Sequence, residues 1–211
     1  MYLSDTVDAL AHALDSGRGR IDTLARRLQE GGLLPKSIGG SNRPAVNIGD
    51  VVSLLLAHAV GTGYGEVAKA VSDLRNYQSD AGISAGECIA NMIRALVALD
   101  VRNGAAAAFS TVSITKGSRP AVVVRITAED EPVELTFTPD GAKWQPHKAD
   151  GVFETVVVPG LTLFKLANQL RELLPPQDEV RTFAISTVNG RPIDEWRAGV
   201  DAELARMPVN Q

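Results

Sequence analysis

The residues best able to do chemistry in this chain of 211 residues are basic ones near its beginning. Between residues 16 and 46, six basic side chains stand against two acidic ones, so this stretch has a net charge of +4. The whole chain carries −4, which leaves −8 for the other residues. A positive stretch on an acidic chain suits a protein that contacts a polyanion with one surface, although a solvated charged helix has the same composition. The basic residues are Arg18, Arg20, Arg26, Arg27, Lys36 and Arg43.

Apolar spacing places three of these side chains on one helix, predicted over about 20–29. The residues expected to pack inward are Ile21, Leu24, Ala25 and Leu28. An arginine can pair bidentately with guanine or clamp a phosphate, and a threonine can reach a phosphate or a thymine methyl. We therefore expect Arg20, Thr23 and Arg27 to face a groove of DNA. Phosphate contacts are expected from Arg18, Arg26, Lys36 and Arg43.

The segments on either side of this helix are also patterned. A first helix is predicted over 3–14, capped by Ser4 or Asp5, and a four-residue break at 16–19 follows it and contains Arg18. After the stop at Gly31–Gly32, a polar loop over 36–43 completes a small β-hairpin at 34–46. In that hairpin we expect contacts to phosphate or the minor groove from Lys36, Ser37, Ser41, Asn42 and Arg43.

Taken together, residues 5–46 resemble a winged helix-turn-helix of bacterial and phage-type regulators. The resemblance is carried by the run from Ile21 to Leu28 followed by Gly32-Leu33-Leu34-Pro35, and covers about 45 residues. It implies that the second helix enters the major groove of double-stranded DNA while the hairpin, the wing, lies along the backbone. It also implies a dimer on a two-fold site.

Two parts are predicted in the rest of the chain. Further helices are expected near 51–60, 64–77 and 85–99, with Asn47 and Ser84 as caps. From residue 107 the apolar period becomes two, which predicts strands at about 109–114, 121–126, 133–137, 153–158 and 183–188. Helices at 161–174, covering the sheet, and at 194–206 complete an α+β fold. We therefore expect a helical DNA-binding unit at 1–104 and an antiparallel-sheet unit at 105–211.

The sequence gives no sign of catalysis. The histidines His12, His58 and His147 are scattered, so neither a metal site nor a cofactor is expected, and no nucleophile elbow is present. The glycines at 61–65 lack the Gly-Lys-Ser/Thr ending of a phosphate loop. Cys88 is the one cysteine and reads as a buried apolar side chain. No signal peptide or membrane span is predicted, so we expect a cytoplasmic protein.

These observations predict a sequence-specific, homodimeric transcription regulator that is not an enzyme. The second unit would assemble the dimer or bind a protein partner such as the transcription machinery. Three alternatives remain open. They are a phage or prophage DNA-packaging or assembly protein, a protein-interaction module that does not bind DNA, and a hydrolase with His147 or His58 beside a carboxylate.

Overall fold

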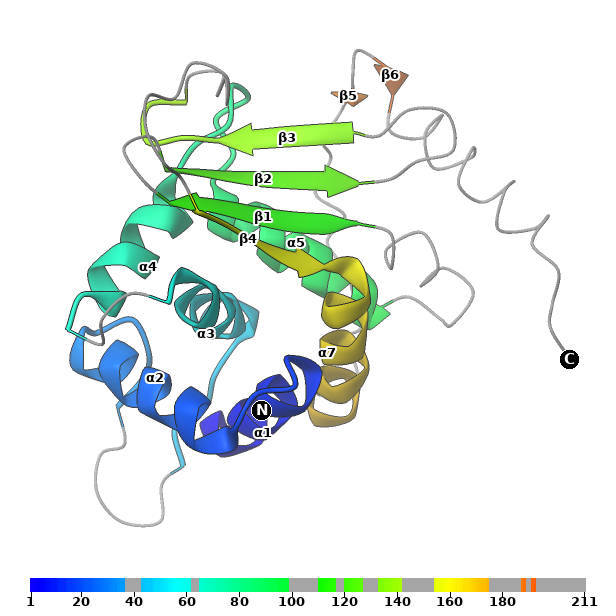
Figure 1. The fold of residues 1–211 in the computed structure, drawn as a ribbon. Helices are drawn as coiled ribbons and strands as arrows, with labels where there is room; N and C mark the ends of the chain where they lie inside the picture. The colour runs from blue at the N-terminus through cyan, green and yellow to red at the C-terminus, as the bar shows by residue number, and fades with distance from the viewer. Residues whose placement is uncertain are drawn as a thin grey trace, which may run out of the picture.

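The computed structural model describes residues 1–36, 43–61, 65–98, 110–116, 120–126, 133–141, 154–174, 187–188 and 191–192. Within these residues the fold is mixed α+β, with six helices and a four-stranded antiparallel sheet (Figure 1). The helices are α1 (Leu3–Ala13), α2 (Arg18–Glu30), α3 (Ile48–Val60), α4 (Val67–Asn76), α5 (Ala85–Ala98) and α7 (Gly160–Leu173). The strands are β1 (Thr111–Lys116), β2 (Ala121–Ile126), β3 (Val133–Phe137) and β4 (Glu154–Pro159), with a separate pair, β5 (Thr187–Val188) and β6 (Arg191–Pro192).

Helix α3 lies at the centre of the molecule. Its residues are apolar on nearly every side, and of its thirteen residues ten are buried. Asn47 begins it with a capping box: the Asp50 amide donates to Asn47 Oδ1 at 3.2 Å, and the Asn47 amide donates to Asp50 Oδ2 at 2.8 Å. Gly61 ends it in the left-handed conformation (φ 58°), which glycine adopts without strain. The capped and buried α3 is the support on which the other helices pack.

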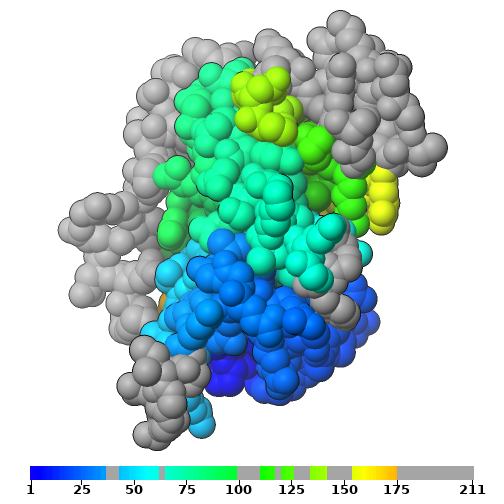
Figure 2. Space-filling model, turned by 90° about the vertical axis from the view of Figure 1, so that its left-hand side faces the viewer, coloured from blue at the N-terminus to red at the C-terminus, as the bar shows by residue number. Residues whose placement is uncertain are grey.

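The remaining helices surround α3. Helices α2, α4 and α5 pack against it, and α1 packs against α2. Figure 2 shows α2 and α4 side by side on one face of the molecule, and the two helices are in contact. Each turns an apolar stripe inward, as helical spacing predicts. The outward faces of α2 and α4 are therefore neighbouring parts of one surface.

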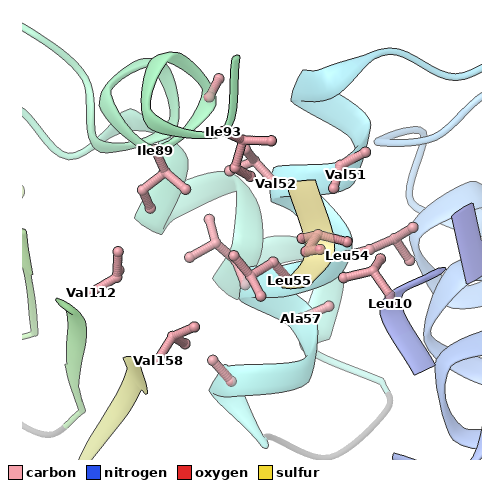
Figure 3. Close-up of a cluster of buried hydrophobic side chains, with 14 of the residues drawn as sticks. Leu10, Val51, Val52, Leu54, Leu55, Ala57, Ile89, Ile93, Val112 and Val158 are labelled. Carbon is pink, nitrogen blue, oxygen red and sulfur yellow. The ribbon is translucent and has the colours of Figure 1, made fainter. Parts of the chain in front are cut away.

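The four-stranded sheet has the order β3-β2-β1-β4, every pair antiparallel. Val112 pairs with Val124 on one side and Val158 on the other, and this register brings the apolar side chains onto one face. That face meets α3: Figure 3 shows Val112 and Val158 directed toward Leu55, with Leu10 of α1 on the far side of the helix. Sheet and helices thus share one continuous core.

Helix α7 connects the sheet to the helices. It follows β4 and packs against α5 and α1, and its buried residues include Leu163, Leu166 and Leu170. Arg171 donates to the carbonyl oxygens of Val97 at 2.9 Å and Leu96 at 3.0 Å, at the end of α5. A cation there suits the negative end of a helix. The second half of the chain therefore supports α1, the helix on which α2 rests.

Several predicted elements need correction. The N-cap of α1 is Tyr2, not Ser4 or Asp5, because the chain enters α1 from a β-bridge between Tyr2 and Ala45. Helix α2 begins two residues earlier than predicted, so Arg18 lies in the helix and the break spans residues 14–17. The sheet is covered by α3 as well as α7. No helix among the described residues is long and apolar enough to cross a membrane.

Some predictions fall outside the described residues. The boundary between 1–104 and 105–211 lies within 99–109, so the division into two units stays a prediction. The terminal helix at 194–206 lies outside as well, and of the strand at 183–188 only 187–188 is described.

Candidate nucleic-acid interface

Helix α2 carries five of the ten predicted DNA-contacting residues. Its inner face is buried against the neighbouring helices through Ile21, Leu24, Ala25 and Leu28, as the apolar spacing predicted. Gly17 is its N-cap and Gly31 its C-cap, and Gly32 follows in the left-handed conformation (φ 76°). With one side held in the core, the outward side of α2 is fixed in direction.

The outward side of α2 is basic. Arg18, Arg20, Arg26 and Arg27 are all exposed. Thr23 is half-buried and donates its hydroxyl to the Gly19 carbonyl oxygen at 2.8 Å, so this hydroxyl has acceptor capacity left for a ligand but its proton is engaged. The structure thus places all five residues on one exposed helix.

Three of the four arginines are paired with carboxylates. Arg26 Nη2 lies 2.8 Å from Asp22 Oδ2, and Arg27 Nη1 lies 2.7 Å from Glu30 Oε2. Arg18 pairs with Asp8 of α1, and this hydrogen bond raises the pKa of the Arg18 guanidinium. Among the described residues Arg20 has no ion-pair partner. The positive surface is therefore partly neutralised, and Arg20 is its unpaired cation within the described part of the chain.

The charges at the two ends of α2 run partly against the helix dipole. Cations favour the C-terminal end of a helix and anions the N-terminal end. Here Arg18 and Arg20 lie in the first turn, which contains no acidic residue, and Glu30 lies at the last position, although Arg27 in the last turn follows the usual preference. No side chain caps the first amides, and no atom lies within 4 Å of where a Cβ would stand at Gly17 or Gly19. The N-terminal end of α2 is positive, uncapped and open.

The predicted wing is described only at its two ends. Lys36 and Arg43 are exposed. Ser37, Ser41 and Asn42 lie outside the described residues. The Gln29 side chain donates to the Pro35 carbonyl oxygen at 2.7 Å, and the Val46 amide donates to the Met1 carbonyl oxygen at 3.0 Å. Among the described residues of 34–46, Ala45 forms its β-bridge with Tyr2 and no pairing joins 34–36 to 43–46; residues 37–42 of the predicted hairpin lie outside the described residues.

His58, which the alternative hydrolase prediction placed beside a carboxylate, lies close enough to this surface to interact with Arg20. It lies in the last turn of α3, and its Nδ1 is buried with no hydrogen-bond partner among the residues that the structure describes. Burial first, and then the positive charge of Arg20, lowers the pKa of the His58 imidazole. A neutral His58 therefore lies near the unpaired cation of α2.

Sequence reasoning missed the ion pairs. Helical spacing of three and four residues could have revealed Arg27–Glu30 and Asp22–Arg26. The Asp8–Arg18 pair has no such signal because its members lie on two helices. No group of histidine, cysteine and carboxylate side chains suited to a metal ion occurs among the described residues.

Comparison with protein-family models, with curated proteins and with solved structures finds no match for this chain.

Proposed function

We propose that this protein is a sequence-specific regulator of transcription that binds double-stranded DNA through α2. The observation that carries the proposal is the exposed basic side of α2, whose first-turn arginines oppose the helix dipole. Such an arrangement costs local stability, and departures from local rules concentrate where a surface serves function. An uncapped positive helix end also suits phosphate, because free amides and arginines attract the same anion.

The stripe formed by Arg20, Thr23 and Arg27 suits the major groove. These residues are spaced at i, i+3 and i+7, so they lie along one line of the helix. Thirteen residues give α2 a length of about 20 Å, enough to lie in a groove about 12 Å wide and contact several base pairs. In the proposed complex Arg20 and Arg27 read base edges and Thr23 accepts a hydrogen bond or touches a thymine methyl.

The remaining cations would hold the DNA backbone. Arg18 and Arg26 flank the stripe, and Lys36 and Arg43 flank residues 37–42. The proposed wing includes these two residues together with Ser37, Ser41 and Asn42. In this proposal the protein is a winged helix-turn-helix that acts in the cytoplasm as a dimer on a two-fold site, with half-sites about 34 Å apart. The second half of the chain would provide the dimer contact or bind the transcription machinery.

Substitution of the two arginines tests this assignment. A duplex selected from a random-sequence pool by the full-length protein is titrated in fluorescence anisotropy with wild type, Arg20→Ala and Arg27→Ala. If each side chain reads a base, each substitution should cost about 1–3 kcal/mol of binding free energy.

Arg125→Ala is the matched control. Arg125 is exposed and pairs with Glu134 at 2.6 Å. Its replacement by alanine therefore removes one positive charge and one exposed ion pair from the sheet, away from α2. The control should bind as wild type does. Equal affinity of all four proteins would show that α2 does not read DNA.

A further inference from the structure

We propose that Asp8, Asp22 and Glu30 determine specificity by holding three arginines away from the phosphates of non-cognate DNA. The inference rests on the proposed DNA-binding function and adds a role for acidic residues within the same surface. It starts from the ion pairs Arg18–Asp8, Arg26–Asp22 and Arg27–Glu30.

The three pairs neutralise the surface selectively. One carboxylate comes from α1 and two come from α2, and each engages a different arginine. Arg20, between them, has no ion-pair partner among the described residues. A helix whose ion pairs served only its stability could have every arginine paired with a carboxylate. On α2, one arginine thus remains available to attract DNA, while three are engaged by carboxylates that compete with phosphate.

Helix stability does not account for Glu30. Asp22 precedes Arg26 by four residues, the orientation that also stabilises a helix. Glu30 follows Arg27 and lies at the negative end of the helix, where a carboxylate is unfavourable. Asp8 pairs across two helices, so it joins α1 to α2 and lies outside the i, i+4 pattern that stabilises α2 by itself. Neither Glu30 nor Asp8 is therefore placed where a carboxylate would stabilise α2 best.

Competition between carboxylate and phosphate gives a reason for this placement. Both anions accept the same hydrogen bonds from a guanidinium, and exposed ion pairs are weak, so one is readily exchanged for the other. On non-cognate DNA the exchange gains little, because the displaced carboxylate stays beside the phosphate and repels it. On the cognate site base contacts add to the exchange and outweigh the repulsion. Repulsion between carboxylate and phosphate therefore lowers the affinity for non-cognate DNA more than the affinity for the cognate site.

Neutral isosteres test the inference on the full-length protein. The variants are Asp8→Asn, Asp22→Asn, Glu30→Gln and the triple combination, and the control is Glu134→Gln, which loses the carboxylate of the Arg125 pair on the sheet. Dissociation constants are measured by anisotropy on a random-sequence duplex pool and on the selected duplex. Thermal melts followed by circular dichroism establish that each variant is folded. If Asp8→Asn loosens the packing of α1, the comparison of Glu30→Gln with wild type still tests the inference.

Each neutralised carboxylate should tighten binding to the random pool by about two- to fivefold, and the triple variant by roughly tenfold or more. Binding to the selected duplex should tighten less, so the ratio between the two dissociation constants falls. Glu134→Gln should leave both constants unchanged. If wild type binds DNA and the variants keep its ratio, the inference fails while the proposed function stands. If neither wild type nor any variant binds either duplex at low salt, both fail.

Discussion

The contact between the end of α2 and the start of α4 allows a sharp test of how the basic helix is held. A Cβ added to Gly31 would lie 2.3 Å from the Cβ of Ala68. Carbon atoms in favourable contact lie about 3.5–4.0 Å apart, so Gly31→Ala creates a severe overlap. The backbone at Gly31 (φ −77°, ψ 0°) is one that alanine adopts freely, so the overlap is the whole of the steric cost.

The expected change in the free energy of unfolding follows from two opposing effects. An extra methyl in a packed site costs about 1–3 kcal/mol. Replacing glycine by alanine on a compatible backbone gains about 0.4–1 kcal/mol, since the unfolded chain has less freedom to lose. Because the 2.3 Å approach is a severe overlap, the cost of the extra methyl lies in the upper part of its range, about 2–3 kcal/mol, and Gly31→Ala should destabilise the protein by about 1–2.6 kcal/mol.

Urea denaturation of the full-length protein, followed by circular dichroism, measures this change. Gly19→Ala is the matched control on the same helix: nothing lies within 4 Å of the added methyl, so this variant should be more stable by about 0.5–1 kcal/mol. Ala68→Gly in the Gly31→Ala background should relieve the overlap, which would appear as a favourable coupling of about 1 kcal/mol or more. A Gly31→Ala protein as stable as wild type would refute the packing of α2 against α4.

Three further predictions concern the core that supports α2. Asn47→Ala removes the capping box of α3 and should lower the free energy of unfolding by about 1 kcal/mol in the same urea assay, and an unchanged midpoint would contradict the cap. Burial raises the pKa of the Cys88 thiol to about 12, so a thiol reagent at about pH 8 should react with the unfolded protein and very slowly with the native one; fast reaction without urea would contradict this burial. Because burial and Arg20 lower the pKa of His58, its contribution to stability is complete above about pH 6.5 and is lost as pH falls below that value. A series of unfolding measurements from about pH 5 to 8 should show a smaller loss for His58→Gln than for wild type, and equal curves would contradict it.

Local patterns in the sequence predicted most of the elements because their causes are local. The apolar period of α2, the Asn47–Asp50 box and the alternation in β2 and β3 are each contained within a few residues. The same locality explains why the basic residues of α2 could be assigned to an exposed face.

What could not be predicted depends on partners distant in the sequence. The N-cap of α1 is set by the bridge from Tyr2 to Ala45, which displaces the local candidates Ser4 and Asp5. An amphipathic pattern shows which side of α7 is buried but not what buries it, so its packing against α1 and α5 was missed. The Asp8–Arg18 pair was missed for the same reason.

The packing of α7 also determines which protein should be used in binding experiments. A fragment ending near residue 105 would lack α7 and β1–β4, and would expose the apolar side chains of α1, α3 and α5 that they cover. Full-length protein is therefore the appropriate material for every test of α2.

The salt dependence of DNA binding by the full-length protein tests the central claim most directly. Six basic side chains are assigned to the surface, so the logarithm of the binding constant should fall linearly with the logarithm of salt concentration between about 50 and 200 mM, with a slope no steeper than roughly −5 per protomer. Lys36→Ala should make that slope shallower by about one. Absence of salt-sensitive binding at micromolar protein and low salt would contradict the assignment of α2 as a DNA-binding helix.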